Sequence, residues 1–338
     1  MARLIEPVPR PSATRLDVVL GSLAGRAGAG DAPLVPPFRT GLDPLDETLR
    51  GGFRSQDLVL LGGKPGVGKT MVAVQWARAM ALDGADVIYA CYEHSPRLLA
   101  ARLLMMEVGS IASGSGLRDV EQIPRHLADC AAGWATLEDV PDSRGMLSDA
   151  LACMRTYAGR LWLVPASSDV TGVAELRELV KRHGSDRTAV FVDYLQKIVP
   201  SSGGGEPNAH MAAAACDLKD LALTSNALVV AIAASTSAGL TETRLRPHHL
   251  RSASALAYEA DVIIMLNEKV DAVSRVHLAY DPVKAETFRD YLVMSIEKNR
   301  NGPAGADLEF EKDFAYARLL AAGGHVAQRL VDGRVDAR

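Results

Sequence analysis

The residues with the most specific chemistry form one short segment at positions 63–70, which reads GKPGVGKT. A glycine, four residues and then Gly-Lys-Thr make a complete P-loop pattern. The glycines let backbone N–H groups curl around phosphate oxygens, Lys69 extends its charge towards the β- and γ-phosphates, and the Thr70 hydroxyl is a ligand for Mg²⁺. We therefore expect a site for ATP and Mg²⁺ built from Gly63, Lys64, Pro65, Gly66, Val67, Gly68, Lys69 and Thr70.

The segments on either side place this loop between a strand and a helix. An apolar run at 57–63 precedes it, and a helical pattern at 70–84 follows and ends at a glycine. A glycine-rich turn that matches by chance would lack these flanks, whereas a P-loop needs the helix N-terminus for its dipole.

Two carboxylates end other apolar runs. Asp193 follows the buried part of the run at 188–195, where it is the expected second protein ligand for Mg²⁺. Tyr194 comes next, so the adjacent glutamate that many P-loop ATPases use is absent. Glu93, at the end of the run 85–93, is the candidate to orient water, because both strand ends face one edge of a doubly wound sheet. The alternatives are a carboxylate that merely ends a strand and an ordinary surface glutamate.

Two cations lie far along the chain, where an apolar run breaks into a turn. Lys298 and Arg300 are two residues apart in MSIEKNRNGPAG, so on a strand they share one face. An arginine supplied by a neighbouring chain can accelerate phosphoryl transfer by roughly a thousand-fold. The alternative is a pair of solvated surface cations.

The chain alternates short apolar runs with helical patterns, which is typical of a doubly wound α/β protein with a largely parallel sheet. Helices fall between the runs, as at 171–184, and long insertions are expected at 108–147 and 267–288. The expected strands are 57–63, 85–93, 160–166, 188–195, 227–235, 260–266 and 289–298.

Three parts are expected along the chain. Residues 1–37 are rich in Pro, Gly, Ala and Arg and predict a flexible arm, 38–320 form the ATPase domain, and 321–338 form a weakly structured tail. A short amphipathic helix at about 13–24 is predicted within the arm, where it either docks on another surface or packs on its own domain. Its apolar positions are Leu16, Val19, Leu20 and Leu23.

Composition excludes several classes of protein. A net charge of −4 and a pI near 6.1 argue against coating nucleic acid by bulk charge. Four scattered cysteines without CxxC spacing are typical of a reduced cytosolic protein. No run approaches the ~20 apolar residues of a membrane span, and the start has no apolar core of signal-peptide length. We expect a cytoplasmic protein without membrane contact.

Four stretches resemble the ATPase domain of the hexameric replicative helicases of the DnaB type, within the RecA-like group. They are TGLDPLDETLRGGFRSQDLVLLGGKPGVGKT, YEHSPRLLAARLLMMEVG, FVDYLQKI and EKNRNGPAG, within residues 38 to 318. The resemblance implies a RecA-like, mostly parallel sheet with helices on both faces, Glu93 as catalytic glutamate, and a hexameric ring of identical chains. It also implies that Lys298 and Arg300 reach the γ-phosphate held by a neighbour, and that the amphipathic helix docks on the adjacent subunit.

The chain departs from this family where ATP is coupled to DNA. Ala234 occupies the position of a glutamine that senses the γ-phosphate, and LRSASA at 250–255 replaces an element that touches the ssDNA backbone. The loop at 200–210 has no lysine or arginine. A cationic patch for single-stranded DNA remains, formed by Arg244, Arg246 and Arg251; the alternative is a solvated loop.

Two functions stay open from the sequence. The first is an ATP-hydrolysing, ring-forming DnaB-like helicase motor that acts on single-stranded DNA, which the turn holding Arg300 and the retained Arg251 favour. The second is a RecA-like oligomeric ATPase that uses ATP as an assembly or regulatory switch on a protein partner without unwinding DNA. Ala234 and the acidic net charge favour the second. A kinase of a small substrate would leave Lys298 and Arg300 without a purpose.

Overall fold

The chain divides into two compact units, residues 1–36 and 37–338. The computed structural model describes residues 15–17, 20–21, 35–115, 122–142, 145–198, 207–251, 253–273 and 282–331. In the first unit Leu16 and Leu20 are helical and exposed. The other apolar positions of the predicted amphipathic helix, Val19 and Leu23, lie outside the described residues.

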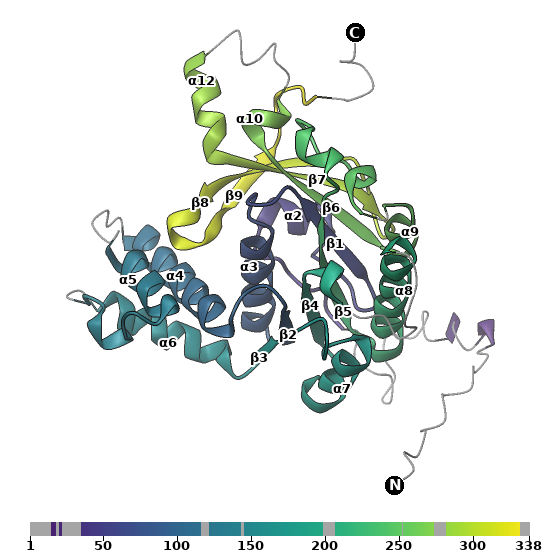
Figure 1. Cartoon of the computed structure of the whole chain (residues 1–338), viewed down its shortest axis with the longest axis horizontal. Coiled ribbons are helices and arrows are strands. Elements are labelled where there is room, and N and C mark those ends of the chain that lie inside the picture. The colour runs from purple at the N-terminus through teal and green to yellow at the C-terminus, as the bar shows by residue number, and fades with distance from the viewer. Residues whose placement is uncertain are drawn as a thin grey trace. The chain divides into compact units, whose positions relative to one another are not determined.

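Nine strands form one sheet in the described part of the second unit, in the order β3-β2-β4-β5-β1-β6-β7-β8-β9 (Figure 1). Strands β1 to β6 pair in parallel, and β7 to β9 continue the sheet as an antiparallel meander. Their bounds are β1 (Leu58–Gly63), β2 (Asp86–Cys91), β3 (Leu161–Pro165), β4 (Thr188–Asp193), β5 (Leu228–Ala234), β6 (Val262–Glu268), β7 (Tyr291–Asn299), β8 (Asp307–Asp313) and β9 (Arg318–His325). The mostly parallel sheet and its seven predicted strands are confirmed.

Helices cover both faces of the sheet, because successive side chains of a buried strand point to opposite sides. Leu58 and Leu60 of β1 pack in one buried cluster with Leu176 and Leu218, which belong to helices on one face. That face carries α7 (Val173–His183), α8 (Pro207–Ser225) and α9 (Ala253–Glu259). The opposite face carries α3 (Lys69–Leu82), with α4 (Pro96–Ser115), α5 (Gln122–Ala132) and α6 (Met146–Ala158) beside it (Figure 1).

The described part of the second unit also contains the short helices α2 (Asp43–Thr48), α10 (Lys269–Ala272) and α12 (Pro282–Thr287). Within the described ranges, no helix has the length and apolar content needed to cross a membrane.

Two strands were not predicted, and one of them runs past an expected domain boundary. Strand β8 (DLEFEKD) alternates Leu308 and Phe310 with charged residues, the pattern of a half-buried antiparallel strand rather than a continuous apolar run. Strand β9 continues to His325, past the expected end of the domain at 320, because its backbone pairs with β8. An isolated antiparallel β-bridge also joins Val273 to Leu330, and Leu330 lies within the expected tail.

Candidate functional site

The segment 63–70 connects the end of β1 to the start of α3. Gly68 lies at the N-terminus of α3 with φ of 100°, a conformation that side-chain-bearing residues rarely adopt. A Cβ atom there would lie 3.2 Å from the Phe314 ring and 3.4 Å from the Met71 side chain. Only glycine therefore lets the chain turn here while Phe314 packs over the loop.

Lys69 lies inside the curve of this segment. Its Nζ donates hydrogen bonds to the carbonyl oxygens of Gly63, at 3.0 Å, and Lys64, at 2.7 Å. Burial lowers the pKa of Lys69 to about 8, although the nearby carboxylates of Asp193 and Glu93 act in the opposite direction. The ammonium group is thus held next to two carboxylates in a partly dehydrated position.

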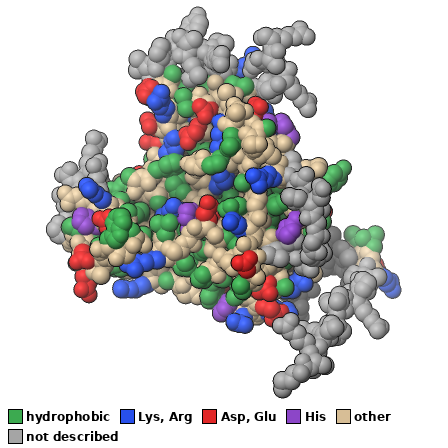
Figure 2. Space-filling model, viewed as in Figure 1, with side chains coloured by type: hydrophobic (Ala, Val, Ile, Leu, Met, Phe, Trp, Pro, Cys, Tyr) green, Lys and Arg blue, Asp and Glu red, His purple; other side chains and the backbone are tan. Residues whose placement is uncertain are grey.

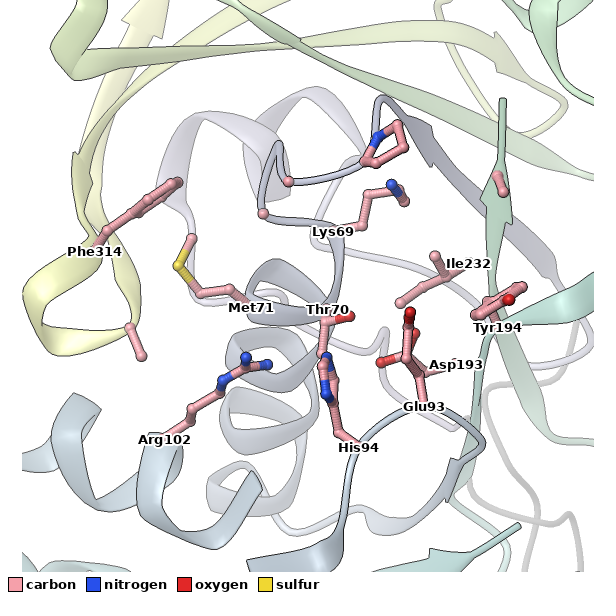
Figure 3. A pocket seen from close by; sticks show the side chains of 15 residues that line it. Lys69, Thr70, Met71, Glu93, His94, Arg102, Asp193, Tyr194, Ile232 and Phe314 are labelled. Carbon is pink, nitrogen blue, oxygen red and sulfur yellow. The ribbon is translucent and has the colours of Figure 1, made fainter. Parts of the chain in front are cut away.

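A cavity of about 560 Å³ opens in front of this segment (Figure 3). Glu93 and Asp193 line the same cavity as Lys69 and Thr70, so the fold brings together residues that lie on three different strand ends or helix starts. The remaining described lining residues are Pro65, Gly66, Gly68, Met71, His94, Arg102, Tyr194, Ile232, Ala234, Phe314 and Ala317.

Asp193 has the chemistry of a metal ligand. Its side chain ends β4, is 2% exposed, and accepts a hydrogen bond of 2.9 Å from the Tyr89 hydroxyl through Oδ2. Burial raises the pKa of Asp193, and the bond from Tyr89 opposes that rise. The other oxygen, Oδ1, is buried, and the Thr70 hydroxyl lies close enough to the carboxylate to oppose the rise of its pKa. A buried carboxylate beside the Thr70 hydroxyl fits the oxygen ligands that Mg²⁺ prefers.

Three lining residues that bear on ligand binding were not predicted from the sequence. His94 directly follows Glu93, and Arg102 projects from α4 into the cavity (Figure 3). Burial lowers the pKa of both side chains. Phe314 comes from the short turn between β8 and β9 and lies at the end of the cavity away from Asp193 (Figure 3). His94 had a local signal, its position beside Glu93, whereas only the fold brings Arg102 and Phe314 to the P-loop.

Comparison with known families agrees with this architecture. Residues 38–139 and 149–318, more than half of the chain, match the family described as DnaB-like helicase C terminal domain. The chain belongs to that family. The predicted resemblance is thereby confirmed.

Relatives of this DnaB-like chain cover most of its length. It is 28% identical over 281 residues to the replicative DNA helicase DnaB of Treponema pallidum (strain Nichols), a match that covers 81% of this chain and 54% of that protein. It is 26% identical over 302 residues to DnaB of Rickettsia bellii (strain RML369-C), which covers 83% and 57%. A shorter match of 92 residues, 37% identical, covers 26% of this chain and 19% of the DNA repair protein RadA of Mycobacterium tuberculosis (strain ATCC 25618 / H37Rv). The chain thus spans about half the length of the curated DnaB relatives it matches.

Solved structures confirm the RecA-like DnaB fold. A structure described as an ATPase domain superposes with a TM-score of 0.68 at 19% identity, covering 91% of this chain and 99% of that one. A structure described as a DnaB-like replicative helicase and its interactions with primase superposes with a TM-score of 0.64 at 20% identity, covering 90% and 67%.

In this DnaB-like chain Lys298 and Arg300, the two cations predicted to reach a neighbour's γ-phosphate, lie apart from the 560 Å³ cavity. Lys298 donates hydrogen bonds to the carbonyl oxygens of Ala257, at 2.6 Å, and Ala260, at 2.5 Å, at the C-terminal end of α9. Arg300 forms an ion pair of 3.1 Å with Asp261. Neither cation is among the described residues that line the cavity of its own chain.

The predicted cationic patch is only partly exposed. Arg244 is 8% exposed, pairs with Asp307 at 2.5 Å, and hydrogen-bonds the Ser295 hydroxyl. The charge of Arg244 is therefore buried and compensated within the chain, which disfavours the predicted contact with DNA. Arg246 is half-buried and pairs with Glu297 at 2.8 Å, whereas Arg251 is exposed.

Ala234 ends β5 at the wall of the cavity. The Gln196 side chain holds its backbone: Ala234 N donates to Gln196 Oε1 at 3.2 Å, and Gln196 Nε2 donates to Ala234 O at 3.5 Å. The end of β5 thus offers a methyl group to the cavity and is tied to the segment after β4.

Proposed function

We propose that the chain is an ATP-hydrolysing motor of the DnaB helicase type, which assembles into a ring and acts on single-stranded DNA. The observation that carries the proposal is the meeting of Lys69, Glu93 and Asp193 in one cavity that Arg300 of the same chain does not line. Such a cavity has a phosphate cradle and two carboxylates, and a further cation from a neighbouring chain would complete it.

Five of the lining residues would divide the tasks of hydrolysis among them. Lys69 and Arg102 would neutralise the charge of the polyphosphate, and Glu93 would orient the water that attacks the γ-phosphorus as the bond to the β–γ bridging oxygen breaks. Thr70 and Asp193 would hold Mg²⁺, which screens the phosphate charges when bound. All five residues already line one cavity, which supports this division of tasks.

The turn that carries Lys298 and Arg300, here called the finger turn, would complete the site of a neighbouring chain. Arg300 is about half exposed, so its guanidinium can exchange the Asp261 carboxylate for a phosphate of another chain. Arg300 also donates to one carbonyl at the end of α9, that of Tyr258, whereas the less exposed Lys298 donates to several carbonyl groups there. We assign the trans contact to Arg300 and the support of the turn to Lys298.

A second cavity suits the assembly of a ring. It measures about 260 Å³ and lies among α4, α5 and α6, where Leu104, Leu127 and Leu151 line it. Its lining is mostly apolar, with Arg97 and Thr136 among the lining residues, which matches a groove that receives the apolar face of an amphipathic helix. The occupant we propose is the segment that carries Leu16 and Leu20 in an adjacent chain, since both side chains are exposed.

The alternative function is a nucleotide-driven assembly switch on a protein partner. The burial of Arg244 and the pairing of Arg246 favour it, because they leave Arg251 as the exposed member of the predicted patch. Figure 2 shows acidic and basic side chains interspersed on the visible face rather than gathered in one basic field. Contact with DNA would then depend on Arg251 repeated around a ring.

ATP turnover with and without single-stranded DNA tests the proposal. We expect DNA to stimulate turnover, Glu93→Gln and Arg300→Ala to abolish it, and Arg251→Ala to weaken the stimulation. Turnover that ignores DNA but still requires Arg300 would replace the motor with the assembly switch. Turnover that survives Glu93→Gln would contradict the proposed hydrolytic role of this site.

A further inference from the structure

His94 lies inside the cavity proposed for ATP, next to the carboxylates. It follows Glu93 in the bend just after β2, lines the cavity, and is half-buried. Its ring makes no hydrogen bond with any other described residue. In Figure 3 the imidazole lies between Arg102 on one side and the carboxylates of Glu93 and Asp193 on the other. A half-buried imidazole whose two nitrogens lack partners among the described residues is free to bind a ligand that enters the cavity.

The position of His94 corresponds to one end of the bound nucleotide. Lys69 reaches the β- and γ-phosphates in a P-loop, and the carboxylates that serve hydrolysis lie beyond it. The end of the cavity near Glu93 and Asp193 is therefore the terminal-phosphate end. Phe314 lies at the opposite end (Figure 3), where an aromatic ring suits the base rather than a phosphate.

The wall of the cavity formed by β5 has no side chain that could donate a hydrogen bond to the terminal phosphate. Strand β5 presents Ile232 and Ala234 there, and neither side chain has a hydrogen-bond donor. Outside the P-loop, the described lining residues whose side chains carry a hydrogen-bond donor are His94, Arg102 and Tyr194, and of these His94 and Arg102 carry nitrogen donors. Arg102 is a permanent cation on a long helix-borne side chain, whereas His94 is short and adjacent in the chain to Glu93. A contact made by His94 would therefore be sensitive to the exact position of the terminal phosphate.

We propose that His94 donates a hydrogen bond to the γ-phosphate of ATP in its own chain and so distinguishes ATP from ADP. This inference rests on the proposed function, because it deepens the description of the same site. ADP lacks the group that His94 would contact, so the imidazole contributes to the affinity for the triphosphate and not to that for the diphosphate. The chain would thus sense its nucleotide state from the end of β2 and not from the end of β5.

Calorimetric binding of ADP and of the non-hydrolysable analogue AMP-PNP, both with Mg²⁺, tests the inference on the full chain. Loss of one phosphate hydrogen bond in His94→Ala should weaken AMP-PNP binding about tenfold. The same variant should leave ADP affinity within about twofold, since ADP makes no contact with the ring. His94→Gln keeps a side-chain N–H donor and should recover part of the lost preference.

Two control variants separate this effect from a general loss of the site. Phe314→Ala, at the other end of the cavity, should weaken ADP and AMP-PNP alike. His183→Ala should change neither, because His183 stacks on Trp162 at the end of α7, away from the cavity. Retained ADP binding by His94→Ala also reports that this variant is folded.

The outcomes distinguish failure of the inference from failure of the proposed function. An unchanged ratio of AMP-PNP to ADP affinity in both His94 variants would overturn the sensing role and leave ATP binding intact. Equal weakening of both nucleotides would also overturn it, because the ring would then shape the cavity rather than read the phosphate. Absence of any nucleotide binding by the unmodified chain would overturn both proposals.

Discussion

The guanidinium of Arg300 lies 3.1 Å from the carboxylate of Asp261 in the same chain. Asp261 is itself nearly buried and also accepts hydrogen bonds from Lys219 Nζ, at 2.6 Å, and from the backbone N–H of Leu58, at 2.8 Å. Leu58 begins β1, the strand that leads into the P-loop. The finger turn is thus tied to the strand that carries the nucleotide site of its own chain, while its exposed side is free to meet another chain.

Mixing two inactive variants should restore ATP turnover if Arg300 acts on a neighbour. Arg300→Ala and Lys69→Met should each lower turnover about a thousandfold when alone. In an equal mixture that exchanges subunits freely, about a quarter of head-to-tail interfaces contain an intact Lys69 and an intact Arg300. Turnover of the mixture measured against each variant checks this, and a mixture as inactive as its components would place the action of Arg300 within its own chain.

Nucleotide affinity should fall as the pH rises above 8. Burial holds the pKa of Lys69 at about 8 in the free chain, and a bound phosphate favours the protonated ammonium. Since the terminal phosphate is already fully ionised there, the Kd for ADP should rise about tenfold per pH unit above 8. Calorimetry between pH 7 and 9.5 measures this slope. Lys69→Met should bind weakly with no such slope, and an equally steep slope in that variant would assign the titration to another group.

Removal of the Phe314 ring should weaken binding of the nucleobase. The ring is 41% exposed and lies against Gly68, so one of its faces or edges is open to the cavity. Stacking of a base on an aromatic side chain predicts about tenfold weaker ADP binding for Phe314→Ala. Phe314→Tyr, which keeps the ring, should bind ADP normally. Unchanged affinity in Phe314→Ala would mean that the base lies elsewhere.

A buried ion pair joins α3 to α4 and should be sensitive to removal of one partner. Glu107 is 1% exposed and accepts hydrogen bonds from Arg78 at 2.5 and 2.6 Å and from the Tyr157 hydroxyl at 2.7 Å. Burial would raise the pKa of Glu107, but Arg78 and Tyr157 together bring it below its ordinary value. Glu107→Ala should lower the free energy of unfolding by about 3 kcal/mol, because the Arg78 charge then has no partner.

Urea unfolding at neutral pH measures this loss. A double variant, Arg78→Met with Glu107→Leu, removes both charges and keeps apolar volume, so it should recover most of the stability. A double variant less stable than Glu107→Ala would show that packing, and not the uncompensated charge, accounts for the loss. The same carboxylate sets a pH window: its stabilisation is present above the pKa of an unfolded glutamate and is lost as the pH falls through the lowered pKa of the folded state.

The predictions that succeeded depend on local signals. Strand β1, the loop at 63–70 and α3 are contiguous in the chain, so an apolar run, a glycine spacing and a helical pattern define them together. Strands buried on both faces read as continuous apolar runs, and for that reason β1 to β7 were found within two residues of their ends. The alternating, charged sequence of β8 carries no such run.

Burial and partners of polar side chains depend instead on contacts between distant parts of the chain. Arg244 and Arg251 belong to one arginine-rich stretch, yet Arg244 pairs with Asp307 on β8 while Arg251 faces solvent. No spacing within the stretch could have separated them, because the deciding carboxylate lies on a strand that joins the sheet from much farther along the chain.

The site shows the same division. Residue types and spacing were enough to nominate Lys69, Thr70, Glu93 and Asp193, since each ends a strand or begins a helix at the carboxyl edge of a parallel sheet, and that edge is shared. The tertiary structure alone brought Phe314 over the P-loop and left the Arg300 turn outside the cavity of its own chain. Strand pairing and helix packing set those positions. Both are contacts between segments far apart in the chain, and the sequence of one segment does not indicate which other segment it will contact.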